Sequence, residues 1–209
     1  VDPWQLIDKF GADTLRWYLL AVSPPWVPTR FDEDGIREVA SRFFGTLINV
    51  YSFFVMYANI DKLNPAALNI PVKDRPEIDR WIISRLNTLI KQVNENMPEY
   101  ELTKIVRSIG AFLIDEVSNW HVRRSRERFW SNEFDTDKKS AYLTLYEVLL
   151  ALSKLMAPFA PFISEDIYLN LTGGKALESV HFEAYPEVNE ALIDSELEER
   201  MGLVITLVS

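Results

Sequence analysis

The residues best suited to recognition chemistry are concentrated in one segment, Asn119–Trp130, which reads Asn-Trp-His-Val-Arg-Arg-Ser-Arg-Glu-Arg-Phe-Trp. It holds four arginines and two tryptophans within twelve residues. A guanidinium group forms paired hydrogen bonds with phosphates and base edges, and it stacks on flat rings. Aromatic rings are platforms for unstacked bases, the usual way in which single-stranded RNA loops are read. The segment is therefore a candidate RNA-binding surface.

The same residues also fit a purely internal role. Helical spacing places Trp120, Arg124 and Arg128 on one side of a helix, with Arg123, Arg126, Glu127 and Trp130 on a neighbouring side. In the internal interpretation Trp120 belongs to the core and Arg124 covers its ring by a cation–π contact. The carboxylates of Asp115, Glu116 and Glu127 then pair with the arginines. Composition and spacing leave both interpretations open.

Net charge restricts how RNA can be bound. The chain has 31 acidic and 22 basic residues, a formal net charge of -9. Proteins that bind nucleic-acid backbones indiscriminately are usually basic. RNA binding by this chain therefore requires positive charge concentrated locally, as it is between residues 119 and 130. The net acidity equally fits a helical protein-interaction scaffold with no RNA role, and this alternative stays open.

Signatures of autonomous catalysis are absent from the sequence. It contains no glycine-rich phosphate loop, no Gly-x-Ser-x-Gly and no His-Glu-x-x-His pattern. There is no cysteine, which excludes disulfides and thiolate metal ligands, and the two histidines, His121 and His181, make a histidine-based metal site improbable. Carboxylate pairs such as Asp115-Glu116 are typical of a solvated helix surface. We predict no catalytic residue, no metal site and no cofactor in this chain.

Helical periodicity dominates the sequence. Apolar residues recur every three or four positions in four long segments, 33–59, 76–96, 102–130 and 138–156. Shorter helices are expected from 3 to 10, from 12 to about 22 and from 162 to 171, the last ended by Gly173-Gly174, and an extended piece is expected at 179–182. Four long amphipathic helices with short connections predict an all-α fold, an antiparallel helix bundle.

Two polar residues stand out on the first long helix. Arg42 and Asn49 are seven residues apart, which places them two turns apart on the same side. They are either polar residues at the end of the bundle or base readers, and position alone favours neither. The aromatic residues of this helix are interpreted as core: Phe43, Phe44, Tyr51, Phe53, Phe54 and Tyr57.

Several segments resemble the class I aminoacyl-tRNA synthetases, in consistent order along nearly the whole chain. Residues 1–4 and 10–18 resemble the stretch after the second ATP-binding signature, and residues 43–51 resemble the first helix of the anticodon-binding bundle. Residues 156–165 are similar to a bundle segment shared by isoleucyl, valyl and leucyl members, with matching residues following at 180–182 and 185–186. Ser23-Pro24-Pro25-Trp26 and the segment 119–130 resemble the isoleucyl pattern.

The resemblance implies a piece of a larger, isoleucyl-type ligase. Residues 1–32 would end the catalytic core, 33–186 would form the anticodon-binding bundle, and 187–209 would begin a C-terminal extension. The intact enzyme would attach isoleucine to its tRNA using ATP and Mg, and both ATP signatures and the editing domain would precede Val1. The partners implied are an isoleucine-specific tRNA and the catalytic and editing domains of the same chain, in the cytoplasm and without a membrane.

The family also implies where RNA is read. In related synthetases the anticodon-reading residues come from the start of the bundle and from the end of its third helix. We therefore expect tRNA anticodon contacts from six residues, Arg42, Asn49, Arg123, Arg124, Arg128 and Trp130. The same module of a valyl-type enzyme is an alternative, because the isoleucyl interpretation depends mainly on the Pro-Pro-Trp stretch and the arginine-rich segment.

Overall fold

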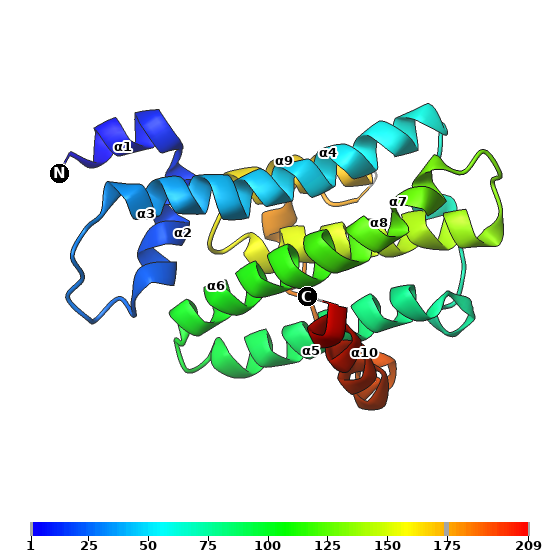
Figure 1. The fold of residues 1–209 in the computed structure, drawn as a ribbon. Helices are drawn as coiled ribbons and strands as arrows, with labels where there is room; N and C mark the ends of the chain where they lie inside the picture. The colour runs from blue at the N-terminus through cyan, green and yellow to red at the C-terminus, as the bar shows by residue number, and fades with distance from the viewer. Residues whose placement is uncertain (1, 174–175, 209) are drawn as a thin grey trace.

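A computed structural model describes residues 2–173 and 176–208, and every regular element in these residues is helical. The predicted all-α bundle is confirmed (Figure 1). The elements are α1 (Pro3–Phe10), α2 (Ala12–Val22), α3 (Glu33–Glu38), η1 (Val39–Phe44), α4 (Gly45–Ile60), η2 (Pro65–Ala67), η3 (Val72–Asp74), α5 (Glu77–Asn96), α6 (Leu102–Ala111), η4 (Phe112–Val122), α7 (Arg123–Trp130), α8 (Thr136–Met156), α9 (Pro161–Thr172), η5 (Val180–Phe182), η6 (Glu190–Leu192) and α10 (Ser195–Val208).

The four predicted long helices are all present, with ends within two residues of those expected. The first comprises α3, the π-helical η1 and α4 without a break, and is called helix 33–60 below. The third comprises α6, the π-helical η4 and α7, and is called helix 102–130. Together with α5 and α8 they lie side by side, and successive helices run in opposite directions (Figure 1).

Local sequence explains where these helices begin. The carboxylate of Asp32 accepts the backbone N–H of Asp34 at 3.1 Å, and that of Asp135 accepts the backbone N–H of Lys138 at 2.8 Å. Such caps satisfy donors that a helix leaves free at its start, each typically worth about 1 kcal/mol. Helix α9 ends at Gly173, which takes a left-handed conformation with φ of 58°. The second glycine of the predicted stop, Gly174, lies outside the described residues.

One main core holds the bundle together. It takes fully buried residues from all the long helices, including Leu47, Ile82, Ile109, Phe129 and Leu145. Removing a side chain of this size from water contributes roughly 1.5–3 kcal/mol. The apolar stripes read from the sequence are therefore the faces that meet in the core.

Helix 33–60 is also apolar enough to cross a membrane by length and composition alone, with a mean hydropathy of 1.4 over its most apolar 18 residues. Its aliphatic and aromatic residues Leu47, Val50 and Phe54 are instead buried against the other helices. Only 28% of that window is buried, so one side of the helix packs on the bundle while the other side stays exposed.

The N-terminal helix α2 packs directly on the bundle. The ring of Trp17 stacks on that of Phe43 with 3.9 Å between centroids, and both belong to the main core. The guanidinium of Arg16 donates to the backbone oxygens of Phe159 at 3.1 Å and Pro158 at 3.0 Å, just before α9. The assignment of residues 1–32 to the end of a catalytic core stays a prediction, but α2 is firmly joined to the helices that follow it.

The residues expected to be extended, 179–182, form a 3-10 turn instead, so that prediction is wrong. The backbone N–H of Val180 donates to the carboxylate of Glu165 at 2.8 Å, and that of His181 donates to the hydroxyl of Ser179 at 3.2 Å. Side chains thus satisfy the backbone donors that a strand would offer to a neighbouring strand.

The apolar end of the chain forms α10, which crosses α5 (Figure 1). Leu197 is buried there, and the carboxylate of Glu198 accepts hydrogen bonds from Thr88 and Arg85, both at 2.8 Å. These contacts fix α10 to the bundle, while Leu207 at its far end is exposed.

Candidate nucleic-acid interface

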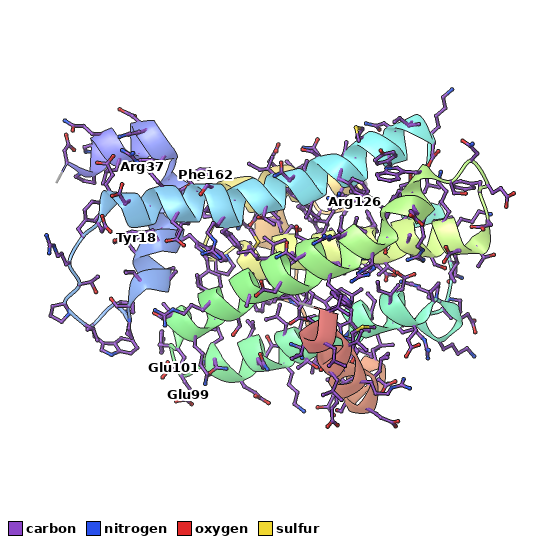
Figure 2. The ribbon with its side chains drawn as sticks, in the orientation of Figure 1. Tyr18, Arg37, Glu99, Glu101, Arg126 and Phe162 are labelled. Atoms are coloured by element: carbon purple, nitrogen blue, oxygen red, sulfur yellow. The ribbon has the colours of Figure 1, made fainter. Side chains whose placement is uncertain are left out.

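The arginine-rich segment divides into an inward and an outward face. His121, Val122, Ser125 and Phe129 are buried. Successive residues of a helix turn by about 100°, so the opposite side of the same helix carries Arg123, Arg126 and Trp130. All three are exposed, and we call them the outer face. Figure 2 labels Arg126 beside helix 102–130, on its side toward helix 33–60.

The two arginines of the outer face are free to bind. Across residues 2–173 and 176–208, the guanidinium groups of Arg123 and Arg126 have no ion pair or hydrogen-bond partner. Trp130 beside them is 55% exposed, which is high for an indole. Unpaired guanidinium donors next to an open aromatic ring suit a ligand with negative charge and flat rings.

Arg124 and Trp120 form the flank of this surface. The guanidinium carbon of Arg124 lies 4.5 Å from the centre of the Trp120 ring, the cation–π contact expected from their spacing. Trp120 is half-buried against the main core, and Arg124 itself is exposed. The pair therefore presents a flat, positively charged layer to solvent.

Arg128 is used differently from its neighbours. Its guanidinium donates two hydrogen bonds to the carboxylate of Asp79, at 2.9 and 2.6 Å, and others to the side chain and backbone oxygens of Asp137, at 3.0 and 2.9 Å. Its side chain is only 13% exposed. A direct contact between Arg128 and RNA would break ion pairs, so the geometry favours the internal role for this one arginine.

The internal partners differ from those expected. Glu116 forms its ion pair with Arg85, at 2.8 Å, and Asp115 and Glu127 line a groove at the surface. The acids that hold Arg128 come from α5 and α8, which sequence spacing within helix 102–130 does not reveal.

Asp79, His121 and Arg128 form what we call the buried cluster. The Nε2 atom of His121 lies 3.0 Å from an Asp79 carboxylate oxygen, and both side chains are fully buried. Burial opposes ionisation of Asp79, but the hydrogen bonds from Arg128 and His121 outweigh it and lower the pKa of Asp79. The Nδ1 atom of His121 has no hydrogen-bond partner within the described residues. Asp79 is thus a buried, charged acceptor that two residues of helix 102–130 share.

A groove of about 950 Å³ runs between helix 102–130 and α10. Trp120, Arg123 and Arg124 line one wall, and Ile205 and Val208 of α10 line the other. No prediction from the sequence placed α10 at this groove. The spacing of Leu197, Met201 and Ile205, at four-residue steps, is the signal that would have placed one face of α10 against the bundle.

Arg42 and Asn49 are both exposed, on helix 33–60. Arg42 pairs with Glu38 at 2.7 Å, an exposed contact worth about 0.3–0.5 kcal/mol and easily exchanged. Phe43 faces Gly110 across the two helices, 3.8 Å from the place of a Cβ there, so Arg42 lies up to about 20 Å before Arg123 along the bundle. Asn49 is two turns nearer. The structure therefore does not bring Arg42 into the outer face.

Comparison with known proteins gives the class of this bundle. Residues 79–209 match a family described as the anticodon-binding domain of tRNA ligases. The chain belongs to this family.

Particular relatives are isoleucine–tRNA ligases. One from Bacteroides thetaiotaomicron is 50% identical over 206 residues, 97% of this chain and 18% of that protein. One from Bacillus thuringiensis is 50% identical over 208 residues, 100% of this chain and 20% of that protein. The chain thus spans about a fifth of the length of these relatives.

Solved structures share the fold. The ternary complex of Agrobacterium radiobacter K84 agnB2 LeuRS–tRNA–LeuAMS matches with a TM-score of 0.71 and 24% identity, over 94% of this chain and 22% of that one. The free-state Mycobacterium tuberculosis methionyl-tRNA synthetase matches with a TM-score of 0.66 and 20% identity, over 93% and 37%. At these identities the likeness concerns the fold alone.

Proposed function

We propose that this chain recognises the anticodon stem-loop of an isoleucine tRNA, as a non-catalytic module of a longer isoleucine–tRNA ligase. The observation that carries the proposal is the outer face, where Arg123 and Arg126 have no partner among the described residues and lie beside an exposed Trp130. Membership in the anticodon-binding family supports it, and so does 50% identity to isoleucine–tRNA ligases.

Each residue of the surface has a distinct part in this proposal. Arg123 and Arg126 donate to phosphates or base edges, and Trp130 stacks on an unpaired base for about 1–3 kcal/mol. Arg124 is held flat by Trp120 and extends the same surface. Asn49 offers an amide from the neighbouring helix, and Arg42, farther along the bundle, contacts the RNA after releasing Glu38.

Chemistry in this proposal belongs to the rest of the ligase. ATP and Mg would be held by its catalytic domain, which, with the editing domain, is a partner of this bundle. The residues described here contain no group of three or more His, Cys, Asp or Glu side chains able to hold a metal ion. A cytoplasmic location follows from the proposed role in translation.

Titration of the chain with transcripts of isoleucine, valine and leucine tRNA, at two salt concentrations, tests the proposal. We expect the isoleucine tRNA to bind most tightly and its affinity to fall as salt rises, because phosphate contacts release counterions. Equal affinity for isoleucine and leucine tRNA would contradict specific recognition of isoleucine tRNA. A preference for valine tRNA would favour the valyl alternative. If the chain binds no tRNA at low salt, the remaining interpretation is a protein-interaction scaffold with no RNA role.

A further inference from the structure

We propose that the buried cluster positions the outer face for RNA binding. Asp79, His121 and Arg128 fix the rotation of helix 102–130 against α5, so that the guanidinium groups on its other side point outward. The inference rests on the proposed RNA-binding function. It assigns to these three residues the part of positioning residues, which act on RNA only through their neighbours.

The hydrogen bonds of the cluster are directional. Arg128 engages both carboxylate oxygens of Asp79, at 2.9 and 2.6 Å, and one of these oxygens also lies 3.0 Å from Nε2 of His121. A forked guanidinium–carboxylate pair holds one relative orientation, unlike an apolar contact that tolerates sliding. Arg128 additionally reaches Asp137 in the first turn of α8. One side chain thus ties three helices together.

The two anchors are well placed to prevent rotation. His121 and Arg128 are seven residues apart, which is two turns and about 10 Å along one face of the helix. The outer face lies on the far side of the same two turns. Any rotation that moved Arg123 or Arg126 out of line would therefore pull both anchors away from Asp79. Leaving a buried charge without a partner is strongly unfavourable, so the cluster resists that rotation.

Apolar packing alone would specify this orientation less strictly. The inward apolar residues beside the two anchors are Val122 and Phe129, whose contacts carry little directional information. Buried polar groups that must meet their partners restrict a helix to one register. The fully buried Asp79 meets that description, because His121 and Arg128 approach it from one helix.

A double-mutant cycle on the 209-residue chain tests the inference, with the isoleucine tRNA transcript as ligand. The variants are Arg123→Ala, Asp79→Asn, which keeps shape and removes charge, and their combination. We expect each single change to weaken binding about tenfold. The combination should weaken it little further, because Asp79 acts through the residue that is already missing. A merely structural defect lowers the unfolding temperature without producing this coupling.

Conservative variants and a matched control sharpen the test. Arg128→Lys keeps the charge but loses the fork and should weaken binding, whereas Arg200→Lys makes the same change in an exposed pair with Glu77 and should not. His121→Gln keeps a donor where Nε2 stands and should retain affinity, while His121→Leu should not. If Asp79→Asn does not fold, the cycle is run with Arg128→Lys in its place.

The outcomes separate this inference from the proposed function. If a folded Asp79→Asn or Arg128→Lys binds like the unchanged chain while Arg123→Ala binds weakly, the positioning role is wrong and RNA binding stands. Fully additive losses would also overturn the positioning role. If the unchanged chain binds no tRNA, the proposed function itself fails.

Discussion

The guanidinium carbon of Arg124 lies 4.5 Å from the ring centre of Trp120, one turn earlier on the same helix. Four residues further on, Arg128 leaves this side and enters the buried pair with Asp79. A single helix therefore uses the same residue type in three ways. One arginine lies on a ring, one anchors the helix, and Arg123 and Arg126 face solvent with no partner in the part of the chain that the structure describes.

Two alanine substitutions should separate the anchoring arginine from an outward one. Arg128→Ala leaves the charge of Asp79 buried without its main partner, and we expect it to lower the free energy of unfolding by about 3–5 kcal/mol. Arg123→Ala removes an exposed side chain and should change it by less than about 0.5 kcal/mol. Urea unfolding followed by circular dichroism measures both. Similar values for the two variants would contradict the contrast drawn from their surroundings.

Trp130 should matter for RNA and little for folding. Trp130→Ala removes an exposed ring, so we expect weaker binding to the isoleucine tRNA by about 1–3 kcal/mol at nearly unchanged stability. Trp4→Ala is the matched control, because Trp4 is also exposed, at 72%, but lies in α1 near the other end of the bundle (Figure 1). The affinities of both variants are measured with an assay that does not depend on tryptophan fluorescence, such as filter retention of labelled tRNA. Equal losses at the two positions would argue against a specific role for Trp130.

Acid should destabilise the bundle through Asp79. Its pKa is lowered in the folded state, because hydrogen bonds from Arg128 and His121 outweigh the opposing effect of burial. A lowered pKa contributes stability that is present above the unfolded value of about 3.9 and is lost as pH falls through the folded value. We expect the free energy of unfolding to decline below about pH 4. The difference in free energy of unfolding between the unchanged chain and Asp79→Asn should shrink over the same pH range. A constant difference would contradict the lowered pKa of Asp79.

Alkali should destabilise the bundle through Tyr168. Burial, aided by the hydrogen bond from its hydroxyl to Glu183, raises the pKa of Tyr168 to about 12. A raised pKa contributes stability that is present below the unfolded value of about 10 and is lost as pH rises through the folded value. We expect the free energy of unfolding to fall between about pH 10 and 12. The free energy of unfolding of Tyr168→Phe, which lacks only the hydroxyl, should fall less steeply with pH. Parallel pH curves for the two chains would contradict the raised pKa of Tyr168.

The fold was largely predictable because its signals are local. Apolar spacing within each segment, together with capping residues such as Asp135, determines where a helix begins and which face is buried. Residues 179–182 escaped prediction because their backbone donors are satisfied by Glu165, a partner 15 residues away from Val180. The place of α10 depended on contacts with α5, more than a hundred residues earlier.

The sequence located the candidate site, but it did not show which arginines face solvent and which one is held in a buried ion pair. The spacing of Trp120, Arg124 and Arg128 suggested one shared side, yet each four-residue step drifts by about 40°, so Arg128 stands some 80° from Trp120. That drift brings it to the inward face. Its partner Asp79 is 49 residues earlier in the chain, and no local pattern identifies such a pair.

Helix 33–60 has a consequence for the geometry of the whole bundle. It runs unbroken for 28 residues, about 40 Å, from the N-terminal helices at one end to the region of α7 at the other (Figure 1). The length of this helix sets the distance and the relative rotation of its two ends. One residue inserted with α-helical geometry would lengthen the helix by about 1.5 Å and rotate its far end by about 100°. An insertion would therefore shift one end of the bundle relative to the other, unless a π-helical stretch such as η1 absorbs the extra residue.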